Sequence, residues 1–173
     1  MSRYRGVNGV ARNVTKRYRG VEGVARKIAK SYRGIAGVAR KYFSGFWWEL
    51  ILSMPPQGVV LEVENKTLTM SATSEESDNG LMCDIYGESL AGKQISFDCV
   101  VSGYNASYST IELIQINSSG QTIKTTALST SGAKSLTLAA TTNFIRFQIW
   151  FGTSGRTASL NVSNLIIGGE SVF

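Results

Sequence analysis

Clusters of turn-forming residues interrupt residues 59–173 at intervals of 8–14 positions, and short runs with strand character lie between them. The clusters are rich in Gly, Ser, Asn and Asp, which β-turns favour. No run has the apolar period of a helix. The nine runs are residues 59–65, 66–72, 80–87, 94–103, 109–117, 121–129, 135–140, 143–152 and 158–169. Short strands at this spacing predict a mainly β fold, an antiparallel β-sandwich or jelly roll.

The run NFIRFQIWFG at residues 143–152 alternates clearly between apolar and other side chains. Successive side chains of a strand point to opposite faces of its sheet. We therefore expect one set of side chains to face the core: Ile145, Phe147, Ile149 and Phe151. Arg146, Gln148 and Trp150 then share the opposite face. An aromatic plane beside polar groups is the chemistry of a sugar-binding platform.

Three tyrosines are candidates to extend this platform: Tyr86, Tyr104 and Tyr108. With Arg146, Gln148 and Trp150 they form the predicted glycan-binding set. The alternative is structural, because outward aromatics on an antiparallel sheet also stabilise cross-strand pairs or lie under a neighbouring subunit.

A nine-residue motif occurs three times in residues 4–45 with a period of 14 residues. Its copies are YRGVNGVAR, YRGVEGVAR and YRGIAGVAR. Residues 1–45, the arm, hold 12 Lys and Arg against one acid, whereas residues 46–173 hold 6 against 11. A basic arm of about +11 is thus joined to a body of about −5. This asymmetry favours an arm that contacts a negatively charged partner.

Two conformations of the arm compete. Asn8-Gly9 and its equivalents suit two-residue turns between short strands, giving hairpins or an extended strap. The hairpin register would place Arg5 opposite Arg12, which is unfavourable. The alternative is a helix with a heptad seam, although two glycines per repeat disfavour it. That seam would contain Val7, Val10, Val14, Val21, Val24 and Ile28.

The arm has too little apolar surface to offset the conformational entropy lost on ordering. We expect it to become ordered on a partner or on copies of itself, through three similar docking steps. The predicted docking residues are Tyr4, Val7, Val10, Tyr18, Val21, Val24, Tyr32, Ile35 and Val38. The alternative is a disordered basic tail without specific docking, which would not require the register of the repeats.

An apolar junction at residues 46–58 separates the arm, 1–45, from the predicted sandwich, 59–173. It carries Trp47 and Trp48 and ends near Pro55-Pro56. We consider three roles for it: it packs against the sandwich, or the two tryptophans form a docking anchor at a protein interface, or, as the weakest alternative, they insert into a membrane surface. We include Trp47 and Trp48 among the docking residues.

Several functional classes have no support in the residues. The chain has no histidine and shows no GxSxG motif, phosphate-binding glycine loop or zinc-ligand spacing. We therefore predict no catalytic residues, no enzyme activity, no metal site and no cofactor.

Cys83 and Cys99 lie in apolar runs and are predicted to be buried thiols, with a disulfide as the alternative. No stretch reaches the ~18 apolar residues of a membrane span.

Two resemblances follow from these patterns. Residues 60–173, with an aromatic-rich penultimate strand before the closing strand ASLNVSNLIIGG, resemble carbohydrate-binding-module-like jelly rolls. The YRGVxGVAR repeats, ended by YFSG, resemble the N-terminal repeats of virion structural proteins in phages and prophages of Gram-positive bacteria.

The second resemblance implies a component of a phage tail, baseplate or capsid, assembled in the host cytoplasm. Its arm would anchor it to other virion proteins, and its sandwich would be displayed outward for stabilisation or host-surface attachment. It also implies a homo-oligomer. Two alternatives remain: a glycan-binding module of a cell-surface or host-recognition protein, and nucleic-acid binding through the basic arm, which we regard as the weaker of the two.

Overall fold

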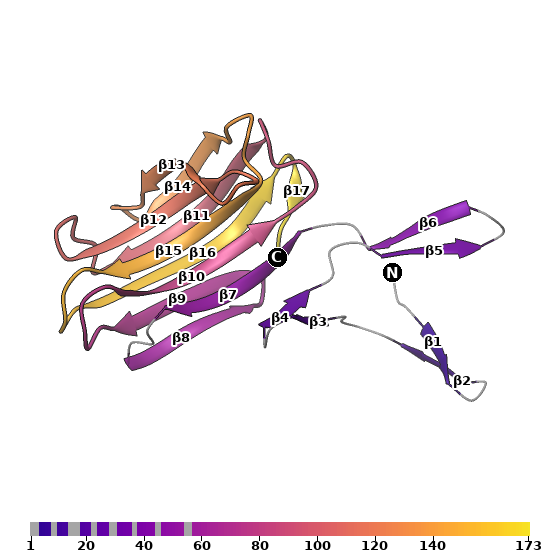
Figure 1. Ribbon diagram of the computed structural model, residues 1–173, viewed down its shortest axis with the longest axis horizontal. Helices are drawn as coiled ribbons and strands as arrows, with labels where there is room; N and C mark the ends of the chain where they lie inside the picture. Colours follow the sequence, from indigo (N-terminus) through magenta and orange to yellow (C-terminus); the bar gives the residue numbers. More distant parts are fainter. Residues whose placement is uncertain are drawn as a thin grey trace. The chain divides into compact units, whose positions relative to one another are not determined.

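A computed structural model describes residues 4–7, 10–13, 18–21, 24–27, 31–35, 38–43, 46–53 and 57–173 (Figure 1). The chain divides into two compact units, Met1–Ser44 and Gly45–Phe173. All regular structure in the described residues is β-strand, which confirms the predicted fold class. No helix in this part of the chain has the length and hydropathy needed to cross a membrane.

Each arm repeat forms one antiparallel two-stranded sheet. The strands are β1 (Tyr4–Val7), β2 (Val10–Asn13), β3 (Tyr18–Val21), β4 (Val24–Lys27), β5 (Ser31–Ile35) and β6 (Val38–Phe43). The three sheets share one register, with Arg5 opposite Arg12 in the first and equivalent arginines paired in the others. The described residues of the arm are therefore strands, as the hairpin alternative predicts, and each sheet contains the unfavourable arginine pairing.

The second unit contains two antiparallel sheets. The five-stranded sheet has the order β13-β12-β15-β10-β7, and the larger sheet has the order β14-β11-β16-β9-β8, with β17 beside β16. The strands are β7 (Trp47–Ser53), β8 (Gln57–Glu64), β9 (Thr67–Thr73), β10 (Asn79–Tyr86), β11 (Gln94–Ser102), β12 (Ser109–Ile116), β13 (Thr122–Ala127), β14 (Gly132–Thr137), β15 (Phe144–Phe151), β16 (Thr157–Ile167) and β17 (Glu170–Ser171).

The apolar sides of the two sheets pack together as a sandwich. Phe97 of β11 and Phe147 of β15 meet edge to face across the interior, with ring centroids 5.3 Å apart. The four β15 side chains predicted to face inward are fully buried. Cross-sheet contacts of this kind bury the apolar area that stabilises the unit.

β7 arises from the segment predicted to be a separate junction. β7 pairs with β10 along its full length, from Trp47 opposite Tyr86 to Ser53 opposite Gly80. The sandwich therefore begins before residue 59. Trp48 packs against the core and meets Phe173 edge to face at 5.3 Å.

Cys83 and Cys99 are both buried free thiols. Burial, reinforced by the neighbouring Asp84 carboxylate, raises the pKa of Cys83 far above its usual value. The folded chain then retains a thiol proton that the unfolded chain loses above about pH 8.5. A group of this kind contributes stability below that pH and loses it as the pH rises.

We predict that the free energy of unfolding declines from pH 8 to pH 10 with a slope approaching about 1.4 kcal/mol per pH unit from Cys83 alone. Urea denaturation of the wild type and Cys83→Ala at a series of pH values measures this slope. A slope unchanged in the variant would contradict the assignment to Cys83.

Candidate functional site

The outward side of the five-stranded sheet collects most of the predicted glycan-binding residues. Arg146, Gln148 and Trp150 occupy alternate positions of β15 and are each partly exposed, while their neighbours on the strand are buried. β10 and β12 flank β15 on either side. We call this surface, made by the outward residues of β7, β10, β15 and β12, the β15 face.

An aromatic ladder crosses one end of the β15 face. Trp47, Tyr86 and Phe144 are register partners on β7, β10 and β15. Their rings stack in sequence: the Trp47 and Tyr86 centroids are 5.4 Å apart with an interplanar angle of 11°, and those of Tyr86 and Phe144 are 4.9 Å apart at 28°. Offset stacking of this kind stabilises the sheet and also presents a continuous aromatic surface.

A salt bridge follows the ladder along the strands. Arg146 Nε and Nη2 donate to Asp84 Oδ1 and Oδ2 over 2.6 and 2.9 Å. Asp84 is 2% exposed although it lies on the outward side, since the guanidinium lies against it. Hydrogen bonding to Asp84 raises the pKa of Arg146. The pair therefore fixes the guanidinium as a rigid, planar, charged surface.

Gln148 and Glu112 are register partners in the next row. Burial raises the pKa of Glu112, and a hydrogen bond from Thr110 opposes this effect. An amide and a carboxylate side by side supply both donors and acceptors to a ligand lying along the strands.

Trp150 lies across Gly80 on the neighbouring strand. The two residues are register partners, and Trp150 Cε3 would lie only 2.8 Å from a Cβ added at Gly80. A glycine at this position is therefore what allows the indole to lie against the backbone of β10. The Trp150 side chain remains partly exposed and can contact a ligand on the outward side of the sheet.

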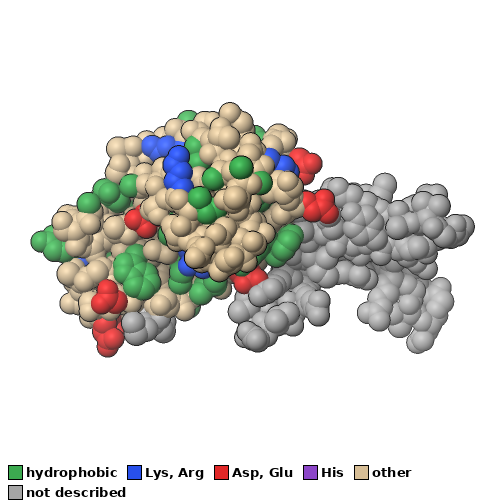
Figure 2. Space-filling model, turned by 45° about the horizontal axis from the view of Figure 1, so that its top comes forward, with side chains coloured by type: hydrophobic (Ala, Val, Ile, Leu, Met, Phe, Trp, Pro, Cys, Tyr) green, Lys and Arg blue, Asp and Glu red, His purple; other side chains and the backbone are tan. Residues whose placement is uncertain are grey.

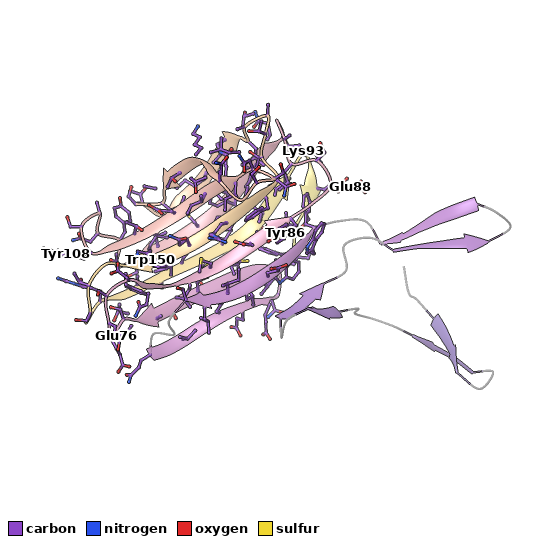
Figure 3. The ribbon with its side chains drawn as sticks, viewed as in Figure 1. Glu76, Tyr86, Glu88, Lys93, Tyr108 and Trp150 are labelled. Atoms are coloured by element: carbon purple, nitrogen blue, oxygen red, sulfur yellow. The ribbon has the colours of Figure 1, made fainter. Side chains whose placement is uncertain are left out.

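The remaining predicted residues have different positions. Tyr108, 41% exposed, lies in the loop before β12, with the Arg156 guanidinium 4.6 Å from its ring centroid. Figure 3 shows Tyr108 and Trp150 toward the same end of the sandwich, with Tyr86 toward the other. Tyr104 packs against the core, contrary to the expectation that it joins the β15 face. The side chains of the arm's predicted docking residues lie outside the described part of the chain.

Sequence reasoning missed three contributors to the β15 face: Trp47 as a ladder member, and Asp84 and Glu112. The alternation of β10 could have identified Asp84, because Leu81, Cys83 and Ile85 predict that it faces outward. Trp47 could not be placed without the pairing of β7.

The resulting surface is elongated. Phe144 and Trp150 are six residues apart on one strand, which corresponds to about 20 Å. Aromatic surfaces stand near both ends, with the ion pair, amide and carboxylate between them. Among the described residues, no group of three or more acidic, His or Cys side chains is arranged to hold a metal ion. The arrangement suits binding by stacking and hydrogen bonding.

Comparisons with known proteins give little further information. No protein-family model matches the chain. No curated protein sequence matches it. One solved structure that aligns with it is the enzymatically active domain of tailspike protein 4 of bacteriophage CBA120, with 13% sequence identity and a TM-score of 0.40. The alignment covers 70% of this chain but 19% of that one, and it does not assign a function.

Proposed function

We propose that this chain is an anchored attachment protein of a phage particle. In this proposal the arm fastens the chain to other virion proteins, and the β15 face of the displayed sandwich binds carbohydrate on the host surface. The sequence of the arm repeats, which resembles that of repeats in virion structural proteins, supports the assignment to a phage particle. The observation that carries the binding role is the partly exposed Trp150 indole beside Gly80, in line with Gln148 and Arg146 on the outward side of β15.

Carbohydrate fits the β15 face for physical reasons. The C–H face of a sugar ring stacks on an aromatic plane and its hydroxyls need donors and acceptors nearby. Trp150 supplies the plane, and Gln148, Glu112 and the Arg146–Asp84 pair follow along the strands. The salt bridge holds its members in one geometry, so little ordering entropy is lost when a ligand binds.

The arm fits an anchoring role. Its sheets have two strands each, and isolated two-stranded sheets are marginally stable in water. Every arm sheet also pairs two arginines across its strands, which an acidic partner would stabilise. We regard these three equivalent sheets as three docking elements. They engage successive positions on a protein surface in the particle.

We predict that Trp150→Ala weakens binding to the preferred glycan by at least about tenfold while the sandwich stays folded at the assay temperature. A glycan array identifies the ligand, and calorimetry with the selected glycan measures the affinity. Val100→Ala is the matched control, because Val100 is 60% exposed on the opposite sheet. Equal glycan affinities of the wild type and Trp150→Ala would exclude the β15 face as the glycan-binding site.

We also predict that removing residues 1–44 leaves a folded sandwich that binds glycan normally but no longer co-purifies with assembled particles. Unit Gly45–Phe173 contains the entire described core, so the truncated chain should fold. Incorporation is measured by immunoblotting of purified particles. The nucleic-acid alternative makes a different prediction: the full chain would bind DNA or RNA with an affinity that declines steeply with salt.

A further inference from the structure

A pocket of about 330 Å³ opens on the outward side of the other sheet, among β14, β11 and β16. Its walls and floor include Ser96, Asp98, Ala133, Ser135, Asn164 and Ile166. It is therefore separate from the β15 face. A volume of this size is within the range of small-molecule sites.

Small side chains and a β-bulge produce the hollow. Ser96 has Ser135 on one side and Ile166 on the other, and Asp98 has Ala133 beside it. Between Ser96 and Asp98 the register with β16 shifts by one residue. Asn164 is in the shifted segment with a φ of 52°, the only positive φ of a non-glycine residue inside a described strand. Bulges of this kind redirect side chains and are common beside functional sites.

The bulge brings Asn164 to Asp98. Asn164 Nδ2 donates to Asp98 Oδ2 over 2.8 Å, which orients both side chains at the edge of the pocket. Asp98 Oδ1 and the hydroxyls of Ser96 and Ser135 make no hydrogen bond to any described residue. The pocket thus offers an oriented carboxylate oxygen and two hydroxyls to a ligand.

The charge and apolar content of the pocket narrow the ligand class. Lys134 also lines the pocket and donates to Thr130 Oγ1 over 3.0 Å. One lysine and one aspartate leave no net charge, which disfavours both anionic and cationic ligands. Ile166, which is 39% exposed, gives an apolar contact on the β16 side of the pocket, and the Ala133 methyl gives a smaller one on the β14 side. On the face that Figure 2 shows, uncharged side chains and backbone make up most of the described surface.

We propose that this pocket binds one ring of a neutral saccharide. Ring hydroxyls donate to Asp98 Oδ1 and exchange hydrogen bonds with Ser96 and Ser135, and a C–H face contacts Ile166. The proposal is independent of the glycan site proposed on the β15 face. If both sites bind, each sandwich has two carbohydrate contacts on opposite sheets and can gain avidity on a dense glycan surface.

The test is an NMR titration of the ¹⁵N-labelled full chain with the methyl glycosides of glucose, galactose and N-acetylglucosamine. Saturable shifts are expected at residues 96–98, 133–135 and 164–166. Asp98→Asn, which keeps the shape of the side chain, is expected to weaken binding roughly tenfold, as removing a charged hydrogen-bond acceptor does.

Ala133→Met fills the pocket from an exposed position of the edge strand and is expected to abolish the shifts. Thr137→Met is the matched control, two residues beyond Ser135 on the same face of β14. Trp150→Ala distinguishes the pocket from the β15 face. This variant should show the same glycoside-induced chemical-shift changes at the pocket residues as the wild type. Absence of saturable shifts at the pocket with all three glycosides, or pocket shifts that persist in Ala133→Met, would overturn the proposal.

Discussion

Replacing Arg146 by methionine is expected to lower the free energy of unfolding by about 3 kcal/mol. Methionine preserves much of the apolar volume of the arginine stem but leaves the Asp84 carboxylate, 2% exposed, without its bidentate donor. An uncompensated charge in such a position is costly, because the buried carboxylate loses both of the hydrogen-bond donors that Arg146 supplies. Urea denaturation followed by tryptophan fluorescence measures the change.

The double variant Asp84→Leu/Arg146→Met provides the control. It removes both charges together, so we expect it to recover most of the stability lost in the single variant. A single-variant loss that the second substitution does not reduce would show that packing of the arginine stem, rather than the ion pair, stabilises this part of the sheet.

Replacing Gly80 by alanine is expected to cost about 1–3 kcal/mol of stability and to abolish glycan binding at the β15 face. The added Cβ would approach the carbonyl oxygen of Ile149 at 2.5 Å and the ring of Trp150 at 2.8 Å. The backbone of β15 cannot shift at low cost, and the Trp150 indole must move away from Gly80. Both properties should therefore change together, as measured by urea denaturation and by calorimetry with the array-selected glycan.

Gly152→Ala is the matched control for this variant. Gly152 follows β15 by one residue, and a Cβ added there would meet its nearest atoms at 3.9 Å, an ordinary contact. We expect stability close to wild type and unaltered glycan binding. If Gly80→Ala behaves as Gly152→Ala does, then Trp150 does not depend on the glycine for its position.

Strand content was the most predictable part of the fold. All nine predicted runs in residues 59–173 overlap observed strands, because turn residues and alternating apolar positions are local signals. β7 was not recognised as a strand, since WWELILS is a nearly continuous apolar run and its pairing with β10 is a long-range property. The two-residue β17 is too short to leave a pattern.

The candidate site was predictable along one strand and not across strands. The alternation of β15 placed Arg146, Gln148 and Trp150 on one face, but the partners on that face depend on register. The position of Tyr104 likewise could not be predicted from the local sequence. It follows Gly103, whose φ of 75° redirects the backbone, and its side chain packs against the core. The hollow beside Asn164 depends on a bulge that no local pattern identifies.

The connection between the arm and β7 has a mechanical consequence. When the arm is held and a ligand pulls on the sandwich, tension reaches the core first at the buried Phe46 and then at Trp47. Trp47 begins a strand whose pairing in the described region is with β10 alone. Under sufficient load β7 is the first strand to detach, and its departure removes Trp47 from the ring of Tyr86. Force on the tether would thereby reshape one end of the β15 face, the surface proposed to bind the ligand.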